Sequence, residues 1–174
     1  MMKLNNNVSV SIAAAITAYS RIHMSQFKNN PKINLYYTDT DSIYTDSNLD
    51  ESLISDNNLG SLKLENIVDK AIFLAPKLYC LITESEQFIH KVKGLKQETE
   101  IQFKDFENLL IKDTFISKSQ SKWFRNLSES KINILEQLYS IKVTNNKRRL
   151  IYNKNNKLIG TESYEINNLK DIRI

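Results

Sequence analysis

The sequence predicts an α+β fold in which a mainly antiparallel sheet with one packed helix is followed by a small basic lobe. Apolar residues recur at helical spacing through residues 8–27, which is typical of an amphipathic helix. Short β-prone runs between residues 33 and 92 are separated by turn residues rather than by helices, which favours antiparallel pairing. Residues 1–70 hold 6 Lys or Arg against 8 Asp or Glu, whereas residues 71–174 hold 18 against 12, so the second part is basic.

The composition excludes several classes of protein. The chain has 174 residues, of which 41% are hydrophobic, so it can build the core of one domain or of two lobes. Cys80 is the only cysteine, which excludes a disulfide framework and a thiolate metal site, and we expect it in the core. His23 and His90 have no partner at metal-ligand spacing. The apolar run at residues 8–19 is too short and too rich in serine to span a bilayer, and it lacks the features of an export signal.

The first expected element is a helix over residues 8–27, with Ser9 or Ser11 as its N-cap. A hairpin follows it. One apolar, β-prone run at residues 33–37 enters a tight turn, and a second run at residues 43–45 leaves it.

Strands are expected to dominate the middle of the chain. Residues 47–58 are polar and without periodicity, so they predict a loop. Leu62 and Leu64 alternate with charged residues, which predicts a half-buried strand. The apolar runs at residues 71–75 and 78–82 are short and rich in β-branched and aromatic residues, which predicts two buried strands.

A strand and two helices are expected next. Residues 88–92 alternate between apolar and polar side chains, as in a strand. Helical spacing returns at residues 103–110 and again at residues 128–139. Between these helices lies a basic segment, and we expect its Trp123 to be part of the core.

The end of the chain predicts hairpins, and the shift from strands to helices predicts the boundary between two lobes. We place that boundary near residues 95–100, which gives a first lobe of residues 1–98 and a second of residues 99–174. The expected hairpin strands are residues 141–144, 148–152 and 158–164.

The candidate site is the turn between the two strands of the first hairpin, where Asp39 and Asp41 are separated by one residue. Two carboxylates held so close repel each other unless a cation lies between them or one is protonated. A hard cation such as Mg²⁺, held against phosphate oxygens, explains such a pair.

Two other carboxylate sites fit the sequence less well. A calcium loop of the EF-hand type needs an oxygen ligand and a glycine where Ile43 and Tyr44 stand. A phosphatase of the haloacid-dehalogenase type begins with a similar strand and Asp-x-Asp string. It also needs a later acidic cluster and a parallel sheet, and the sequence predicts neither.

The string around the two aspartates is more specific than the pair alone. It runs Tyr37-Thr38-Asp39-Thr40-Asp41-Ser42, and it resembles the third signature block, motif C, of family B DNA polymerases. An alanine-rich helix precedes the block, as in that family.

Three later segments resemble the same family. Lys77-Leu78-Tyr79 is similar to the Lys-x-Tyr element near the primer terminus, and residues 91–95 resemble the basic strand and turn that follow it. Residues 145–152 are similar to the end of the protein-primed polymerases of fungal mitochondrial linear plasmids. The resemblance therefore extends from about residue 8 to the end of the chain.

The resemblance implies a partial palm over residues 1–98 and a thumb-like lobe over residues 99–174. It implies nucleotidyl transfer by a two-metal mechanism, with Asp41 as the first metal ligand and Asp39 ligating or polarising beside it. Tyr37, Thr40 and Ser42 would shape the hairpin. The residues implied to contact DNA are Lys77, Tyr79, Lys91, Lys93 and Arg148, for which an ordinary strand edge or a solvated turn is the alternative.

The resemblance also implies cofactors, partners and a location. The cofactor would be Mg²⁺, and the partners primer-template DNA, deoxynucleoside triphosphates, a terminal protein primer and an N-terminal part of the polymerase. The family's other signature blocks, including a further metal-binding aspartate, do not occur in this sequence and would lie upstream of Met1. We therefore expect a C-terminal fragment that is inactive alone, in mitochondria, without a membrane and without a transit peptide. The alternative is a non-catalytic DNA-binding remnant.

Overall fold

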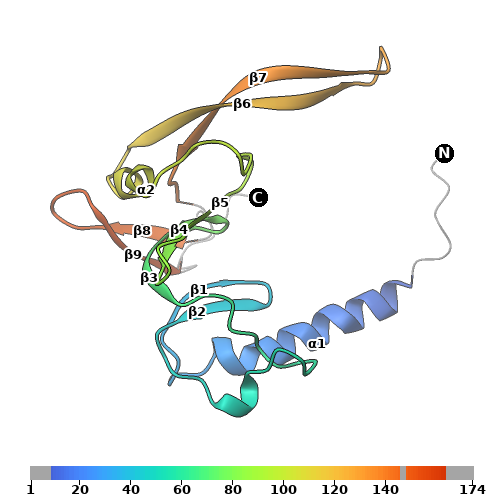
Figure 1. Ribbon diagram of the computed structural model, residues 1–174, viewed down its shortest axis with the longest axis vertical. Helices are drawn as coiled ribbons and strands as arrows, with labels where there is room; N and C mark the ends of the chain where they lie inside the picture. The colour runs from blue at the N-terminus through green and yellow to red at the C-terminus, as the bar shows by residue number, and fades with distance from the viewer. Residues whose placement is uncertain (1–8, 146–147, 164–174) are drawn as a thin grey trace, which may run out of the picture. The chain divides into compact units, whose positions relative to one another are not determined.

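The computed structural model describes residues 9–145 and 148–163, and its first element is the helix α1, Val10–Lys28 (Figure 1). The helix begins where the Ser9 hydroxyl accepts a hydrogen bond from the backbone N–H of Ile12, at 3.5 Å. It ends at Asn29, whose N–H donates to the carbonyl of Ser25. Only its last part is anchored, because Met24 and Phe27 are the helix's buried residues.

The strands β1, Leu35–Asp39, and β2, Ser42–Thr45, form the predicted antiparallel hairpin. Its register shifts between Leu35 and Tyr37, so the side chain of Tyr36 leaves the regular alternation. The Tyr36 hydroxyl donates to Asp46 at 2.7 Å, and this bond lowers the pKa of the Asp46 carboxyl. The base of the hairpin is thus held by side chains as well as by the strands.

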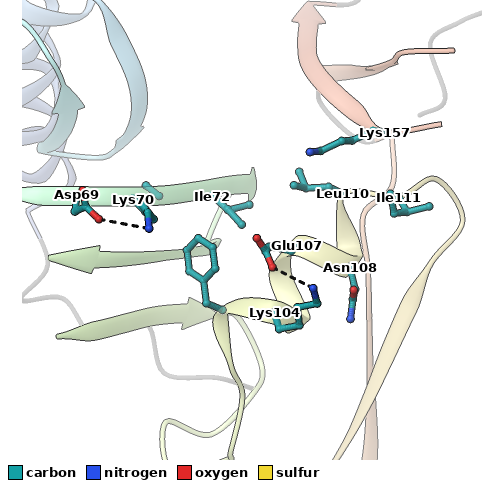
Figure 2. A pocket seen from close by; sticks show the side chains of 11 residues that line it. Asp69, Lys70, Ile72, Lys104, Glu107, Asn108, Leu110, Ile111 and Lys157 are labelled. Atoms are coloured by element: carbon teal, nitrogen blue, oxygen red, sulfur yellow. Dashed lines mark ion pairs between the residues drawn. The ribbon is translucent and has the colours of Figure 1, made fainter. Parts of the chain in front are cut away.

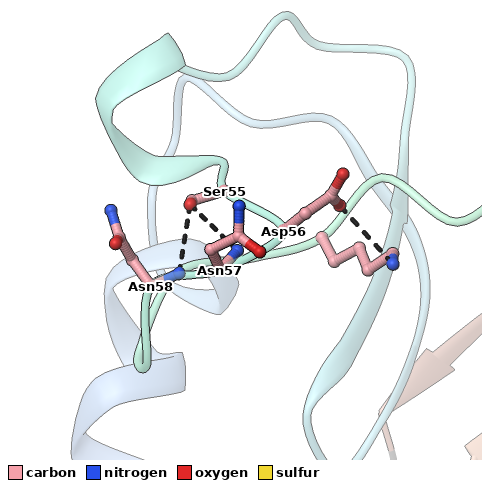
Figure 3. Close-up of polar contacts among 5 residues, drawn as sticks. Ser55, Asp56, Asn57 and Asn58 are labelled. Carbon is pink, nitrogen blue, oxygen red and sulfur yellow. Dashed lines mark hydrogen bonds and ion pairs between the residues drawn. The ribbon is translucent and has the colours of Figure 1, made fainter.

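The loop after the hairpin contains one short 3₁₀ helix, η1, Glu51–Leu53. Beyond it, the Ser55 hydroxyl accepts hydrogen bonds from the N–H groups of Asn57 and Asn58, and Asp56 pairs with Lys63 at 3.6 Å (Figure 3). The strand predicted around Leu62 and Leu64 is wrong. Leu62 makes a single bridge to Ile54, and Leu64 is 63% exposed, because no neighbouring strand pairs with this segment in the described structure.

The strands predicted in the middle of the chain are confirmed as one antiparallel sheet in the order β3-β4-β5. The register pairs Ile72 with Cys80 and Cys80 with His90, so these residues share one face. Cys80 is fully buried, as expected, and burial raises the pKa of its thiol to about 12. The bounds of the strands are Val68–Ala75 for β3, Leu78–Thr83 for β4 and Phe88–Val92 for β5.

The predicted helix after the sheet is α2, Phe103–Leu109, and it fills the core of the structure from Val68 onward. Phe106 is fully buried and Leu109 is 2% exposed. Full burial of such side chains contributes about 2–3 kcal/mol each. The core cluster that they join draws on β3, β4, α2, β7 and β9, and it consists of Leu74, Leu78, Cys80, Ile101, Phe106, Leu109, Ile141, Val143 and Leu158.

The second helix predicted after residue 128 is wrong, because this segment is a strand. The strands β6, Phe115–Asn126, and β7, Lys131–Lys142, pair along their whole length as a long antiparallel hairpin (Figure 1). Apolar residues lie on both faces of the ribbon, and this produces a false helical spacing. The expectation for Trp123 is also wrong: it pairs with Ile134 away from the core and is 66% exposed.

The last hairpin is formed by β8, Arg148–Tyr152, and β9, Leu158–Ser163, as predicted. A bond from the N–H of Leu158 to the carbonyl of Leu110, at 2.7 Å, ties it to the end of α2. The separate strand expected at residues 141–144 is wrong, because Ile141 belongs to β7. The predicted end of the hairpin at residue 164 lies outside the described residues.

The α+β class, mainly sheet, is confirmed, and the chain forms two units that divide between Ile67 and Val68. Each unit is described by itself. Residues 95–100 lie inside the second unit, and the assignment of residues 1–98 to a palm and of residues 99–174 to a thumb stays a prediction. Neither of the helices in the described part of the chain is long and apolar enough to cross a membrane.

One ion pair is expected to stabilise the second unit in a pH-dependent way. Asp105 accepts a hydrogen bond from the N–H of Gln102 and pairs with Lys118 of β6 at 2.9 Å, with both side chains at least three-quarters buried. Burial alone would raise the pKa of Asp105, but the Gln102 N–H and the Lys118 ammonium outweigh it and lower the pKa. The stabilisation is therefore present at neutral pH and is lost as the pH falls through the folded-state pKa.

We predict that Asp105→Asn lowers the free energy of unfolding by about 1 kcal/mol at neutral pH, as measured by urea denaturation. The difference from the wild type should vanish in acid, where Asp105 is protonated in both states. Glu107→Gln is the control, because the pair of Glu107 with Lys104 is exposed and should contribute little. An equal loss at all pH values would contradict the assigned role of the ion pair.

Candidate metal and nucleic-acid site

The two aspartates of the first hairpin lie at a turn whose shape is fixed by its length. Asp39 pairs with Ser42, which leaves Thr40 and Asp41 as a two-residue connection. Thr40 has φ +52°, a left-handed conformation that costs a non-glycine residue about 1 kcal/mol. Contacts around the turn must therefore stabilise it.

Three kinds of contact hold this turn. The ammonium of Lys28, in the last turn of α1, donates to the carbonyl oxygen of Thr40 at 2.8 Å. The Ser42 hydroxyl donates to the carbonyl of Asp39 at 3.0 Å. The rings of Tyr37 and Tyr44, opposite each other in the register, lie with their centroids 6.0 Å apart. Lys28, Ser42 and Tyr37 therefore link the helix, the turn and the strands.

The carboxylates differ in exposure. Asp41 is exposed and Asp39 is half-buried. A pair of carboxylate groups suits Mg²⁺, which keeps several waters and takes few protein ligands together with substrate phosphates. Among the described residues no group of three or more His, Cys, Asp or Glu side chains could hold a metal ion, so this pair offers part of a ligand set.

The sheet of the second unit brings together the residues predicted to contact DNA. Tyr79 of β4 pairs with Lys91 of β5, on the face opposite Cys80 and the core. At the end of these strands the N–H of Lys93 donates to the carbonyl of Lys77 at 2.9 Å. The three lysines are exposed, so four of the five predicted residues gather at one end of the β4–β5 pair.

Arg148 lies apart from this group, on β8. Its guanidinium donates from Nε to the Thr161 hydroxyl at 2.7 Å and from a terminal nitrogen to the Thr161 carbonyl at 3.0 Å. These bonds hold the β8–β9 hairpin together. A DNA contact from Arg148 stays a prediction, and the neighbouring Lys147 lies outside the described residues.

A hollow of about 690 Å³ lies between β3 and α2, on the other side of the sheet from Tyr79 (Figure 2). Four of its charged residues form two ion pairs: Asp69 with Lys70 at 3.9 Å, and Lys104 with Glu107 at 3.7 Å. Lys157 also lines the hollow. Ile72, on the core face of β3, lies in its wall. The hollow is therefore separate from the face of the sheet that carries Tyr79 and Lys91.

His90 of β5 packs against an aromatic neighbour on the same strand. Its ring stacks on Phe88 at 5.5 Å, and burial lowers its pKa, so the imidazole is neutral at physiological pH.

Sequence reasoning missed the residues that support the site from a distance. Lys28 contacts a turn that lies 12 residues away, and Gln120 and Tyr139 contact the turn after β5. Nothing in the local pattern identifies such partners. Gly94 carried a signal, since a glycine after a basic strand often marks a turn with positive φ, and its φ is +92°.

The first unit thus presents a hairpin that carries two carboxylates, and the second unit presents a group of exposed lysines beside Tyr79. The chain is 39% identical over 170 residues, 95% of its length, to a protein of Ascobolus immersus named "Probable DNA polymerase". It is 35% identical over 94% of its length to a protein of the same name from Podospora anserina, and 38% identical over 72% to another from Neurospora intermedia. The matches to the Ascobolus and Podospora proteins confirm that the chain resembles fungal proteins named probable DNA polymerase over nearly its whole length.

The chain spans only 13% to 15% of the length of these curated relatives. No protein-family model matches it. No solved structure matches it either.

We predict that Lys28→Met loosens the turn that carries Asp41. Without the ammonium, the Thr40 carbonyl loses its partner and the left-handed residue loses support, so amide hydrogen exchange at residues 40–42 should accelerate about tenfold. Lys32→Met is the control. This substitution removes the same charge from a neighbouring lysine whose side chain has no described bond to the turn. Equal exchange in the two variants would show that Lys28 does not support the turn.

Proposed function

We propose that this chain is the C-terminal palm and thumb part of a family B DNA polymerase and that it contributes to DNA-directed DNA synthesis. The observation that carries the proposal is the position of Asp39 and Asp41 at the two-residue turn of a hairpin whose sequence resembles motif C. The similarity to proteins named probable DNA polymerase supports the same conclusion.

In the reaction, the 3′-hydroxyl of a primer attacks the α-phosphorus of a deoxynucleoside triphosphate, and pyrophosphate leaves. Asp41 and Asp39 would hold Mg²⁺ here, and bound Mg²⁺ stabilises negative charge on the entering and leaving oxygens. The structural role of the hairpin is to fix where these carboxylates lie, because positioning and electrostatic stabilisation account for most of the catalysis of phosphoryl transfer. A further carboxylate from another part of the polymerase would complete the ligand set.

The basic face of the second unit would bind the primer-template duplex. Lys77, Lys91 and Lys93 would neutralise phosphates as point charges, and Tyr79 would pack against the backbone of the primer end. Such contacts position the duplex without reading its sequence. Binding should therefore depend strongly on salt and weakly on sequence.

The resemblance to linear-plasmid polymerases extends the proposal to a protein-primed enzyme of mitochondria, with a terminal protein as primer. The relatives come from fungi, which agrees with a resemblance to the polymerases of fungal linear plasmids. The chain would act together with an N-terminal part of the polymerase that supplies the other signature blocks.

A second candidate function is that of a DNA-binding remnant without catalysis. The observation that favours it is the absence of a third metal-ligating side chain near the turn among the described residues. An in-frame Asp-x-x-Ser-Leu-Tyr-Pro string upstream in the gene would support the polymerase over the remnant.

A chimera tests the catalytic proposal. We predict that the Ascobolus relative, with its matching segment replaced by this chain, extends a primer with Mg²⁺ and that Asp41→Asn slows extension at least about a hundredfold. Asp56→Asn, in the loop of the same unit, should leave extension unchanged, since Asp56 pairs with Lys63. An active Asp41→Asn chimera would overturn the role of Asp41.

The isolated chain should not extend a primer, because it lacks the further metal-binding carboxylate. If the isolated chain does extend a primer and Asp41→Asn abolishes this extension, the expectation that the chain is inactive alone is wrong.

Binding is tested separately from catalysis. We predict that Lys91→Ala with Lys93→Ala weakens binding of the chain to a primer-template duplex about tenfold and reduces the slope of log affinity against log salt by about 1 per lysine. Fluorescence anisotropy measures both. Lys63→Ala with Lys70→Ala removes the same charge from positions that pair with acidic residues, and this control should bind like the wild type. Equal weakening in both variants would show that net charge alone governs binding.

A further inference from the structure

The turn at residues 93–96 is tied to the β6–β7 hairpin by hydrogen bonds from two side chains. The carboxamide oxygen of Gln120 accepts from the N–H of Lys96 at 2.8 Å, and its nitrogen donates to the carbonyl of Gly94 at 2.9 Å. The hydroxyl of Tyr139 donates to the carbonyl of Lys93 at 2.5 Å. We call Gln120 and Tyr139 the turn clamp.

The buried carboxamide of Gln120 bonds to the turn at both of its ends. Gln120 is 5% exposed, so each end of its carboxamide needs a partner, and the turn provides both. Gln137, its cross-strand partner, has a carboxamide of the same size, but the oxygen of that group has no hydrogen-bond partner. Of these two paired glutamines, Gln120 bonds to the turn through both ends of its carboxamide, whereas the carboxamide oxygen of Gln137 bonds to nothing in the described structure.

The fit between the turn and the clamp leaves no space for a larger residue. Gly94 has φ +92°, and a Cβ at this position would lie 2.6 Å from the hydroxyl oxygen of Tyr139. The turn can approach Tyr139 only because residue 94 is a glycine. The path of the chain after β5 is thus set by Gln120 and Tyr139 together, from one face of the β6–β7 ribbon.

This turn continues directly from the basic face of the sheet. The N–H of Lys93 bonds to the carbonyl of Lys77, and Lys91 pairs with Tyr79. The remaining lysine of the turn, Lys96, donates instead to the Ser121 hydroxyl on β6, at 2.9 Å. The clamp therefore holds the chain directly after β5, next to the exposed Lys91 of β5 and to Lys77, which immediately precedes β4.

We propose that Gln120 and Tyr139 are positioning residues for the binding of duplex DNA. By fixing the turn they hold the ammonium groups of Lys91 and Lys93 in one row, so that the phosphate backbone meets a preformed surface and not two mobile chains. The inference rests on the proposed function, and it assigns a role in binding to side chains that need not contact DNA. It also makes the β6–β7 hairpin a support for the basic face.

The test compares two leucine substitutions in the full chain, binding a primer-template duplex. Gln120→Leu should weaken binding about fivefold to tenfold and reduce the salt slope by about 1, because the lysines no longer meet the phosphates together. Gln137→Leu is the matched control and should match the wild type. The slope separates positioning from folding, because a smaller folded fraction lowers the apparent affinity without changing the slope.

The possible results are distinct. If the wild-type chain does not bind the duplex, the proposed function fails and the inference fails with it. If the wild type binds and Gln120→Leu matches it in affinity and slope, the inference alone is overturned. Should Gln120→Leu not fold, Tyr139→Phe decides, since it removes one hydroxyl and keeps the ring: a reduced slope supports the clamp and an unchanged slope overturns it.

Discussion

The burial of Phe106 is the interaction on which the second unit depends. A helix as short as α2 is not stable in water by itself, so its formation requires packing against other elements. Phe106 and Leu109 meet side chains from β4, β7 and β9 in one core cluster, which joins segments far apart in the sequence. Asp105 then fixes the start of α2 to β6 through Lys118. A short helix thus makes one unit of three separate sheets.

The two chemical parts of the chain are held by different means. In the first unit the turn of Asp39 and Asp41 is set by a two-residue connection and by the ammonium of Lys28, which lies 12 residues from Thr40. In the second unit the basic face depends on a contact between a turn and a distant hairpin. Local geometry is enough to aim two carboxylates, whereas a row of lysines that must match a duplex needs a rigid support.

The sequence predicted what depends on local pattern. The hairpin around Asp39, the strands on either side of Pro76 and the helix around Phe106 all follow from apolar spacing and turn residues. The strand β7 could not be predicted in this way, because Ile132, Leu135 and Leu138 occur at helical spacing in a ribbon with apolar residues on both faces. The contacts of Gln120 could not be predicted from the sequence. The backbone groups that it bonds to lie 24 and 26 residues away, and a glutamine could bond equally well to any exposed polar loop.

The exposed position of Trp123 has a practical consequence. It is the only tryptophan of the chain, and it lies on a two-stranded ribbon next to Ile134 with 66% of its surface exposed. An indole in water emits at long wavelength and is open to soluble quenchers. The tryptophan fluorescence of this protein therefore reports on a single hairpin, and a partner that covers the indole and excludes water from it would shift the emission to the blue without any added label.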